Sequence, residues 1–374
     1  MLRAAIILAA LLIGLAASAR SAATPAVPAG FTIERIGTVP HARELAVASN
    51  GDLFVGTSGL DVVVVADAQG VPKAPRTFVE LDDEPVAGVT IDGDRMILGS
   101  QFGVWELPYQ AGDRGPRAAP HKIASVRTSG AARDHMTTSV AVAHGVLYAS
   151  VGSSCNNCDP ELDPTRASIQ RIALDGGGIA PEARHVRNAI ALTANPATGT
   201  LWAGVAGQDE LAHGHPYEIF DAVTLHEGTV DYGWPFCYEN RKAVKGHDCS
   251  RAAIPRVVFP AYETPIGATF YTADANAAHA FPAEFHGGAF VTLHGSWHQP
   301  PVAPRVAFVP MHGDEPLTPV DWNDPTRQWR TFVSGFQAGD GNRTARPTGI
   351  AVGTDGTLFF SEDETGAIYR IRPR

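Results

Sequence analysis

The chain has 374 residues, 18% of them charged, and a formal net charge of −10. It contains 38 glycines and 28 prolines, and its aliphatic residues are mostly Val, Ile and Ala. This composition is typical of many short strands joined by turns. The negative charge argues against a nucleic-acid partner, whose phosphates require a basic surface.

The N-terminus has the pattern of a secretory signal peptide. Arg3 supplies a positive charge, residues 4–17 form an apolar run, and small residues follow up to Ala23. The run is short for a membrane span, and no later stretch approaches the ~18 uninterrupted apolar residues of a span. We therefore expect residues 1–23 to be cleaved and residues 24–374 to be exported, to the periplasm or the exterior, without a membrane span.

Four cysteines in an exported chain favour two disulfides. Cys155 and Cys158 lie close together in S-S-C-N-N-C, and Cys237 and Cys249 flank a polar loop, so we expect these two local pairs. Haem attachment requires C-x-x-C-H, and Asp159 follows Cys158. A zinc site made of all four cysteines is the alternative.

A hairpin pattern recurs six times along the chain: a short apolar strand, a glycine-containing turn and a second apolar strand. The turn glycines are Gly51, Gly93, Gly145, Gly199, Gly287 and Gly356. A four-stranded propeller blade takes roughly 40–50 residues, so each interval between these glycines has room for one blade. The two longest intervals indicate insertions around residues 209–265 and 298–340.

The sequence therefore predicts an all-β fold, a single six-bladed β-propeller over residues 24–374. Closing six blades into a ring removes free sheet edges. We expect the C-terminal strand from Ala367 and the N-terminal segment from Gly30 to complete the last blade together. A pair of β-sandwich domains is the alternative.

Polar residues recur at two positions of this repeat. The start of a hairpin's first strand and the end of its second lie at the same end, which predicts one shared mouth of the channel. The first position contains His41, Asp134, His135, Arg187, Asn188 and Arg346. The second contains Gly152, Ser153, Gly207, Gln208, Asp209, His294, Gly295, Ser296 and Trp297. Inner strands are otherwise buried, so we expect a shared site, with a structural role as the alternative for each residue.

The residue types indicate the chemistry of this site. Asp134 beside His135 predicts an imidazole that is polarised by a carboxylate and acts as a general base. Arg187 and Arg346 predict binding of carboxylates or of an oxyanion. The site therefore combines a base with a place for an anionic ligand or intermediate.

At these residues the chain resembles the soluble quinoprotein glucose/sorbosone dehydrogenase family, and it is most similar to the sorbosone-dehydrogenase-like branch. The motifs include D-H-M-T-T-S-V at Asp134, R-N-A-I-A-L at Arg187, A-G-Q-D-E-L at Ala206, D-Y-G-W-P at Asp231 and R-P-T-G-I-A-V at Arg346. Together with shorter matches they extend over nearly the whole mature chain.

The resemblance implies that pyrroloquinoline quinone (PQQ) binds above the channel through a calcium ion, Ca²⁺. It implies that His135 takes the hydroxyl proton while hydride passes to the quinone. It also implies that Arg187 and Asn188 contact the cofactor, with Arg187 stabilising the developing negative charge. Gly207 and Gln208 match the positions whose backbone carbonyls bind the calcium.

Arg346 matches an arginine that contacts the cofactor's carboxylates, but nearby positions depart from the glucose-oxidising members. His294 follows the fifth-blade strand where they have a lysine, and Thr348 stands where they have a second arginine. Ala206 stands where they have a glutamine. We expect His294 and Arg343 to replace some of the missing contacts and glucose not to be the substrate.

The predicted function is PQQ-dependent oxidation of an aldose or a sugar aldehyde such as sorbosone, with a separate electron acceptor. One alternative is a calcium-dependent lactonase or esterase on a similar propeller, which requires carboxylate and amide ligands at the channel centre. The repeat positions instead offer mainly arginine and histidine. The other alternative is a propeller that binds a ligand without catalysis.

Overall fold

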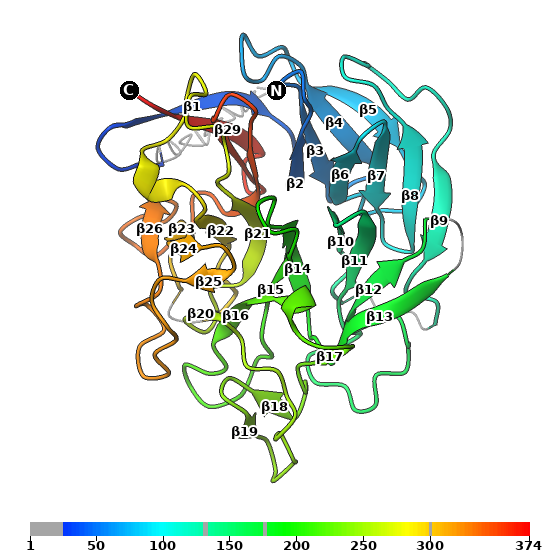
Figure 1. The fold of residues 1–374 in the computed structure, drawn as a ribbon, viewed down its shortest axis with the longest axis vertical. Coiled ribbons are helices and arrows are strands. Elements are labelled where there is room, and N and C mark those ends of the chain that lie inside the picture. The colour runs from blue at the N-terminus through cyan, green and yellow to red at the C-terminus, as the bar shows by residue number, and fades with distance from the viewer. Residues whose placement is uncertain (1–24, 130–133, 175–177, 299–300) are drawn as a thin grey trace, which may run out of the picture.

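The computed structural model describes residues 25–129, 134–174, 178–298 and 301–374, and it confirms a six-bladed β-propeller (Figure 1). The predicted signal peptide, residues 1–23, lies outside the described residues. In the described part of the chain, helical structure is limited to two single 3-10 turns, Val223–Leu225 and Ala283–Phe285.

The first three blades follow one another in chain order, each with its first strand innermost. Blade 1 consists of β2 (Ala42–Val47), β3 (Leu53–Thr57), β4 (Asp61–Val65) and β5 (Arg76–Glu80). Blade 2 consists of β6 (Gly88–Asp92), β7 (Arg95–Gly99), β8 (Gly103–Pro108) and β9 (His121–Ser125). Blade 3 consists of β10 (Thr138–Ala143), β11 (Val146–Val151), β12 (Ser168–Ile172) and β13 (Ile179–Arg184), extended by β17 (Val230–Asp231).

The remaining blades contain the longer connections. Blade 4 consists of β14 (Ala189–Ala194), β15 (Leu201–Val205), β16 (Glu218–Ala222) and β20 (Val257–Phe259). Blade 5 consists of β21 (Pro265–Phe270), β22 (Ala289–Leu293), β23 (Arg305–Val309) and β26 (Arg330–Val333). Blade 6 consists of β27 (Pro347–Val352), β28 (Leu358–Glu362), β29 (Ala367–Pro373) and β1 (Phe31–Thr38).

The ring is closed by the two ends of the chain, as predicted. The N-terminal strand β1 pairs antiparallel with the C-terminal strand β29, from Phe31 opposite Pro373 to Thr38 opposite Ala367. Blade 6 therefore takes three strands from the C-terminus and its outermost strand from the N-terminus. This pairing joins the last blade to the chain that leads into the first.

The six inner strands surround a central channel with a cavity of about 280 Å³. Neighbouring inner strands come very close at glycines. A side chain added at Gly267 would place its Cβ 2.2 Å from the carbonyl oxygen of Thr348, and one at Gly349 would place it 2.3 Å from that of Arg43. These two positions therefore require the smallest residue for the blades to pack around the channel.

Aromatic side chains fill the space between blades 5 and 6. Phe281, Phe285, Phe290, Phe308 and Phe332 are all buried in one cluster with further apolar residues. Their rings meet mostly edge-on or tilted, as in the Phe290–Phe332 pair, with ring centroids 4.8 Å apart and an interplanar angle of 63°. This packing fixes the relative position of the two blades that carry His294 and Arg346.

The two predicted insertion ranges also contain regular blade strands: β16 and β20 within 209–265, and β23 and β26 within 298–340. The additional chain forms two small hairpins, β18 (Cys237–Tyr238) with β19 (Lys242–Ala243), and β24 (Met311–His312) with β25 (Glu315–Pro316).

Both predicted disulfides are confirmed. Cys155 pairs with Cys158 and Cys237 with Cys249, each with Cα atoms 5.6 Å apart. The alternative of a four-cysteine zinc site is wrong, because all four thiols are used in these bonds. In the described ranges, no helix is long and apolar enough to cross a membrane.

Candidate functional site

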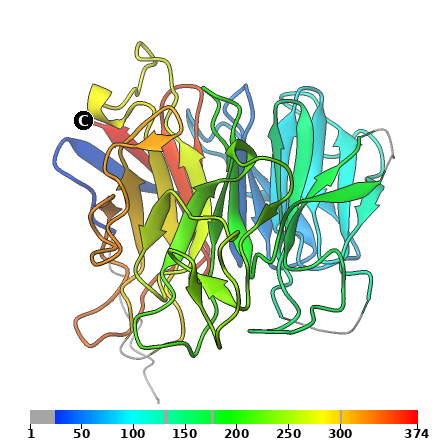
Figure 2. The same cartoon turned by 60° about the horizontal axis from the view of Figure 1, so that its bottom comes forward.

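One face of the propeller carries a cavity of about 520 Å³ at the mouth of the channel. Figure 2 shows the blade strands running between two faces of the molecule, with loops projecting from each. Most of the predicted site residues line this cavity: Asp134, His135, Arg187, Asn188, Gly207, Asp209, His294, Gly295, Ser296, Trp297, Arg343 and Arg346. They come from the loops before the first strands and after the second strands of blades 3 to 6.

Four of the predicted residues do not line this cavity: His41, Gly152, Ser153 and Gln208. His41 is exposed and adopts a turn conformation with φ of 57°, outside the cavity lining. Gln208 is buried, and it lines a smaller neighbouring cavity of about 70 Å³ behind Arg187. Gly207 lines both cavities, and because it has no side chain it presents only its backbone to the 520 Å³ cavity.

His135 is held by the end of strand β11. Its Nδ1 lies 2.9 Å from the carbonyl oxygen of Ser153 and 3.1 Å from the Ser153 hydroxyl. A carbonyl oxygen only accepts hydrogen bonds, so Nδ1 carries the proton and donates it, and the lone pair of a neutral ring is then on Nε2. The Asp134 side chain is exposed. The imidazole is therefore oriented by Ser153, whereas the sequence predicted orientation by Asp134.

Burial, together with the positive charge of Arg187, lowers the pKa of His135 to about 4. The neighbouring Asp134 carboxylate opposes this shift only weakly. The imidazole is consequently neutral at physiological pH. A neutral imidazole with an available Nε2 has the protonation state that a general base requires.

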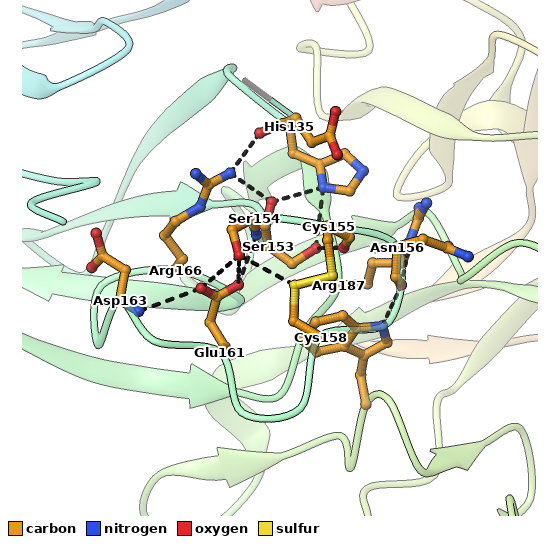
Figure 3. The surroundings of a disulfide bond; sticks show 12 residues. His135, Ser153, Ser154, Cys155, Asn156, Cys158, Glu161, Asp163, Arg166 and Arg187 are labelled. Atoms are coloured by element: carbon orange, nitrogen blue, oxygen red, sulfur yellow. Dashed lines mark hydrogen bonds between the residues drawn. A yellow bond between two sulfur atoms is a disulfide. The ribbon is translucent and has the colours of Figure 1, made fainter. Parts of the chain in front are cut away.

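Two buried arginines fix the backbone around His135. Arg166 donates to the carbonyl oxygens of Asp134 at 2.5 Å and Ser153 at 2.6 Å (Figure 3). Arg127 donates to the carbonyl oxygen of His135 at 2.7 Å. A Cβ added at Gly152 would lie 2.5 Å from both the His135 Cβ and the Asn188 Oδ1. The glycine therefore allows the histidine loop to approach blade 4.

Arg187 is buried, 8% exposed, and points into a polar corner. Its Nε donates to the carbonyl oxygen of Asn156 at 3.2 Å, and one terminal nitrogen pairs with the Asp209 carboxylate at 3.0 Å. Asn156 belongs to the loop closed by the Cys155–Cys158 disulfide (Figure 3), and its side-chain oxygen accepts the Asp209 backbone N–H at 2.8 Å. Sequence reasoning missed Asn156, because nothing in the repeat assigns a place to this loop.

His294 and Arg346 form a second polar group across the cavity. His294 Nε2 lies 3.0 Å from the Asp363 carboxylate, which also pairs with Arg43 at 3.1 Å. Burial lowers the pKa of His294 to about 4, so the ring is neutral and donates its Nε2–H to Asp363. Arg346 donates to the carbonyl oxygens of His294 at 3.2 Å and Gly295 at 2.8 Å. The carboxylate of Asp363 was not expected from the sequence.

Arg343 has a buried Nε that has no partner among the described residues. One of its terminal nitrogens lies 3.5 Å from the Val302 carbonyl oxygen, at the limit of a hydrogen bond. A buried guanidinium donor without an acceptor costs free energy unless a ligand or water supplies one. With Arg187 and Arg346, Arg343 therefore makes the cavity suited to a ligand that bears carboxylates.

Glu218, the first residue of β16, lies beneath this cavity and is 4% exposed. Its carboxylate accepts the backbone N–H groups of Gly207 at 2.7 Å and Tyr262 at 3.0 Å. Burial raises its pKa to about 7. Sequence reasoning missed Glu218, although a glutamate at the start of a short buried strand was a visible signal.

The described residues near Gly207 fit a calcium ion through backbone carbonyl oxygens. The Gly207 N–H is taken by Glu218, and no described residue donates a hydrogen bond to the carbonyl oxygen of Gly207 or Gln208. Carbonyl oxygens are suitable hard ligands for Ca²⁺. In the described ranges, no group of three or more His, Cys, Asp or Glu side chains is placed to hold a metal. The donors that fit are therefore backbone carbonyls, supplemented by the oxygens of a ligand.

Residues 212–374 match the model of a family described as TrAA12-like. An uncharacterized protein of Borreliella burgdorferi is 22% identical over 366 residues, which cover 92% of this chain and 90% of that protein. A pyrroloquinoline quinone-dependent sugar dehydrogenase of Hypocrea jecorina is 24% identical over 288 residues, which cover 68% of this chain but only 60% of that protein.

Solved structures show the same fold. The PQQ domain of pyranose dehydrogenase from Coprinopsis cinerea superposes with a TM-score of 0.79 at 19% identity, covering 94% of this chain and 97% of that chain. A calcium structure of a Trichoderma reesei family AA12 enzyme gives 0.76 at 21% identity, with 94% and 97% covered. A PQQ-bound aldose sugar dehydrogenase from Streptomyces coelicolor gives 0.63 at 16% identity, with 93% and 100% covered.

The matches do not favour the sorbosone-dehydrogenase-like branch over others. They do confirm the wider resemblance that the motifs predicted. The chain is therefore similar to the TrAA12-like family through residues 212–374, and its fold is that of solved PQQ-dependent sugar dehydrogenases.

Proposed function

We propose that the protein is a PQQ-dependent oxidoreductase that oxidises an aldose or a sugar aldehyde, with His135 as the general base. The observation that carries the proposal is the His135 ring, which is neutral, donates Nδ1–H to Ser153 and lies in a 520 Å³ cavity beside Arg187. When bound, PQQ supplies a quinone carbonyl that accepts hydride from the substrate.

The chain's own residues have separate tasks in this proposal. His135 takes the substrate hydroxyl proton on Nε2 and passes it to solvent. Arg187 stabilises negative charge that develops beside it. Arg343 and Arg346 hold the carboxylates of the cofactor, and Asn188 contributes an amide at the same wall.

The backbone carbonyl oxygens of Gly207 and Gln208 would bind Ca²⁺, because carbonyl oxygens are suitable hard ligands for this ion. The two disulfides further support export to an oxidising compartment, as the predicted signal peptide of residues 1–23 implies.

The test is reconstitution of the purified protein with PQQ and Ca²⁺, followed by a panel of aldoses, sugar aldehydes and alcohols with an artificial electron acceptor. We expect sugar-dependent reduction of the acceptor that falls by at least about 100-fold in His135→Gln, the typical contribution of a general base. PQQ binding should persist in that variant. Absence of PQQ binding to the wild-type protein would refute the proposal, and hydrolysis of lactones would identify the calcium-dependent hydrolase instead.

A further inference from the structure

Exposed apolar side chains gather on the face that carries the cavity. In the described ranges, the large hydrophobic residues exposed on this face are Leu60, Phe102, Met136, Leu162 and Trp297. Each lies on a loop that joins strand ends at the mouth of the channel. Single exposed apolar residues are ordinary, but a group on one face indicates an interaction surface.

Hydrogen bonds connect the loops that carry three of these residues: Leu60, Phe102 and Met136. The backbone N–H of Leu81, at the end of blade 1, donates to the Leu60 carbonyl oxygen at 2.9 Å. Two residues further on, the Asp83 carboxylate accepts the backbone N–H of Phe102 at 3.1 Å. The Leu60 loop, the segment from Leu81 to Asp83 and the Phe102 loop therefore lie next to one another on the surface.

The same surface extends to the histidine loop. The Arg127 guanidinium donates to the carbonyl oxygens of Gln101 and His135, both at 2.7 Å. It thereby ties the Phe102 loop to the loop that carries Met136. Since Asp134 and His135 line the cavity, this surface begins at the cavity wall.

Among the described residues of these loops, the exposed charged side chains are all negative. Asp82, Glu84 and Asp134 are exposed within the same loops. Lys122, the nearby cation at the edge of blade 2, lies 3.8 Å from the Asp83 carboxylate and 4.7 Å from the Trp105 ring. Arg127 is buried. We call the surface formed by Leu60, Phe102, Met136, Asp82, Glu84 and Asp134 the apolar–acidic rim.

We propose that the apolar–acidic rim is the docking surface for the electron acceptor, a small redox protein with a lysine-rich face that takes one electron at a time. This inference rests on the proposed function. Oxidation of the sugar removes two electrons and two protons. The electrons leave in two successive one-electron transfers to two acceptor molecules, and the protons leave to solvent.

The composition of the rim suits such a partner. Transient redox complexes bury small interfaces, below roughly 1,200 Å², so a few apolar contacts surrounded by charge are sufficient. Opposite charges accelerate the encounter, and weak contacts permit rapid release. A second copy of this chain would present the same negative charges and repel, and an uncharged saccharide would make no use of them.

The first test is binding without the cofactor. A basic c-type cytochrome in its ferric state is titrated into the apo-protein by calorimetry at low and high ionic strength, beside the same cytochrome with acetylated lysines. We expect binding at low salt that is lost at high salt and with the acetylated form. Asp82→Asn/Glu84→Gln and Leu60→Ser/Phe102→Ser should each weaken binding by about tenfold. Val71→Ser, an exposed residue in the β4–β5 loop of the opposite face, is the matched control.

The second test uses the reconstituted holoenzyme. The rim variants should retain the wild-type rate with a small dye such as dichlorophenolindophenol and lose about tenfold in kcat/KM for the cytochrome. Cytochrome binding equal to that of wild type in the rim variants would overturn the proposal. A loss also in Val71→Ser would do the same. Failure of the wild-type enzyme to reduce the dye would refute the proposed function, whereas cytochrome binding to the apo-protein is measured independently of it.

Discussion

The unusual state of His135 makes the stability of the protein depend on pH in a way that one substitution should remove. The ring is buried beside Arg187, and its pKa is lowered from 6.5 to about 4. Between these two values the unfolded chain binds a proton that the folded protein does not. Stability therefore falls as pH decreases from 6.5 toward 4, and it is unaffected by this group above pH 6.5.

The magnitude follows from the shift. Each pKa unit corresponds to about 1.4 kcal/mol, so lowering the pH from 7.5 to 5.0 should cost about 2 kcal/mol through His135 alone. His135→Gln preserves much of the volume but does not titrate. Relative to wild type, the variant should therefore gain about 2 kcal/mol in unfolding free energy between pH 7.5 and 5.0.

Urea unfolding, followed by tryptophan fluorescence at both pH values, measures this difference directly. His121→Gln, on the exposed edge strand β9, is the control and should leave the pH dependence as in wild type. If the His135→Gln and wild-type stabilities change in parallel between the two pH values, the ring is not desolvated in the folded protein. His135 would then not be a buried neutral base beside Arg187.

Three further predictions concern Arg187, Glu218 and the apolar core that contains Trp202. Arg187→Leu leaves Asp209 without its ion pair and should weaken PQQ binding at least about tenfold in an absorbance titration; unchanged affinity would contradict the role of Arg187 in cofactor binding. Glu218→Leu removes the acceptors of two backbone N–H groups and should lower the unfolding free energy by about 2–3 kcal/mol. Glu218→Gln keeps one of the two acceptor oxygens and should lose less, and an unchanged stability of Glu218→Leu would contradict these hydrogen bonds. Trp202→Ala should cost about 3–5 kcal/mol in urea unfolding, because Trp202 is fully buried; a loss below about 1 kcal/mol would refute this packing.

The fold was predictable from local signals because a propeller blade is a local structure. Each turn glycine sits between two strands that pair directly, as Ala143 does with Val146 on either side of Gly145. The expected completion of one blade by the N-terminal segment from Gly30 and the C-terminal strand from Ala367 is confirmed by the pairing of β1 with β29. In the two long intervals, after Gly199 and after Gly287, the sequence could not distinguish outer blade strands from insertion hairpins. Both are short apolar segments, and only the strand with which each one pairs tells them apart.

The site was predictable where its residues follow the repeat and not where they depend on loops. His135, Arg187, Asn188 and Arg346 meet because equivalent ends of inner strands meet at one mouth. Asn156 enters the cavity from a disulfide-closed loop, a position that no repeat specifies. The Gln208 side chain lines the neighbouring cavity for a related reason: beyond the end of β15 the alternation of a strand no longer fixes the direction of a side chain.

The departures from the glucose-oxidising pattern acquire a physical meaning in this arrangement. Thr348 is buried at the inner strand, where its hydroxyl donates to the Ala42 carbonyl oxygen at 3.0 Å, so this position has no room for an arginine. His294 is neutral and engaged with Asp363, so it adds no charge where a lysine would.

The charge balance of the cavity then explains why a metal is part of the proposal. The three arginines that line it face the carboxylates of Asp134 and Asp209, and Glu218 titrates near neutrality. The protein alone therefore offers little net positive charge to a ligand with several carboxylates, whereas a bound Ca²⁺ would add two charges at the Gly207 and Gln208 carbonyls. PQQ affinity should accordingly fall steeply when calcium is removed with a chelator.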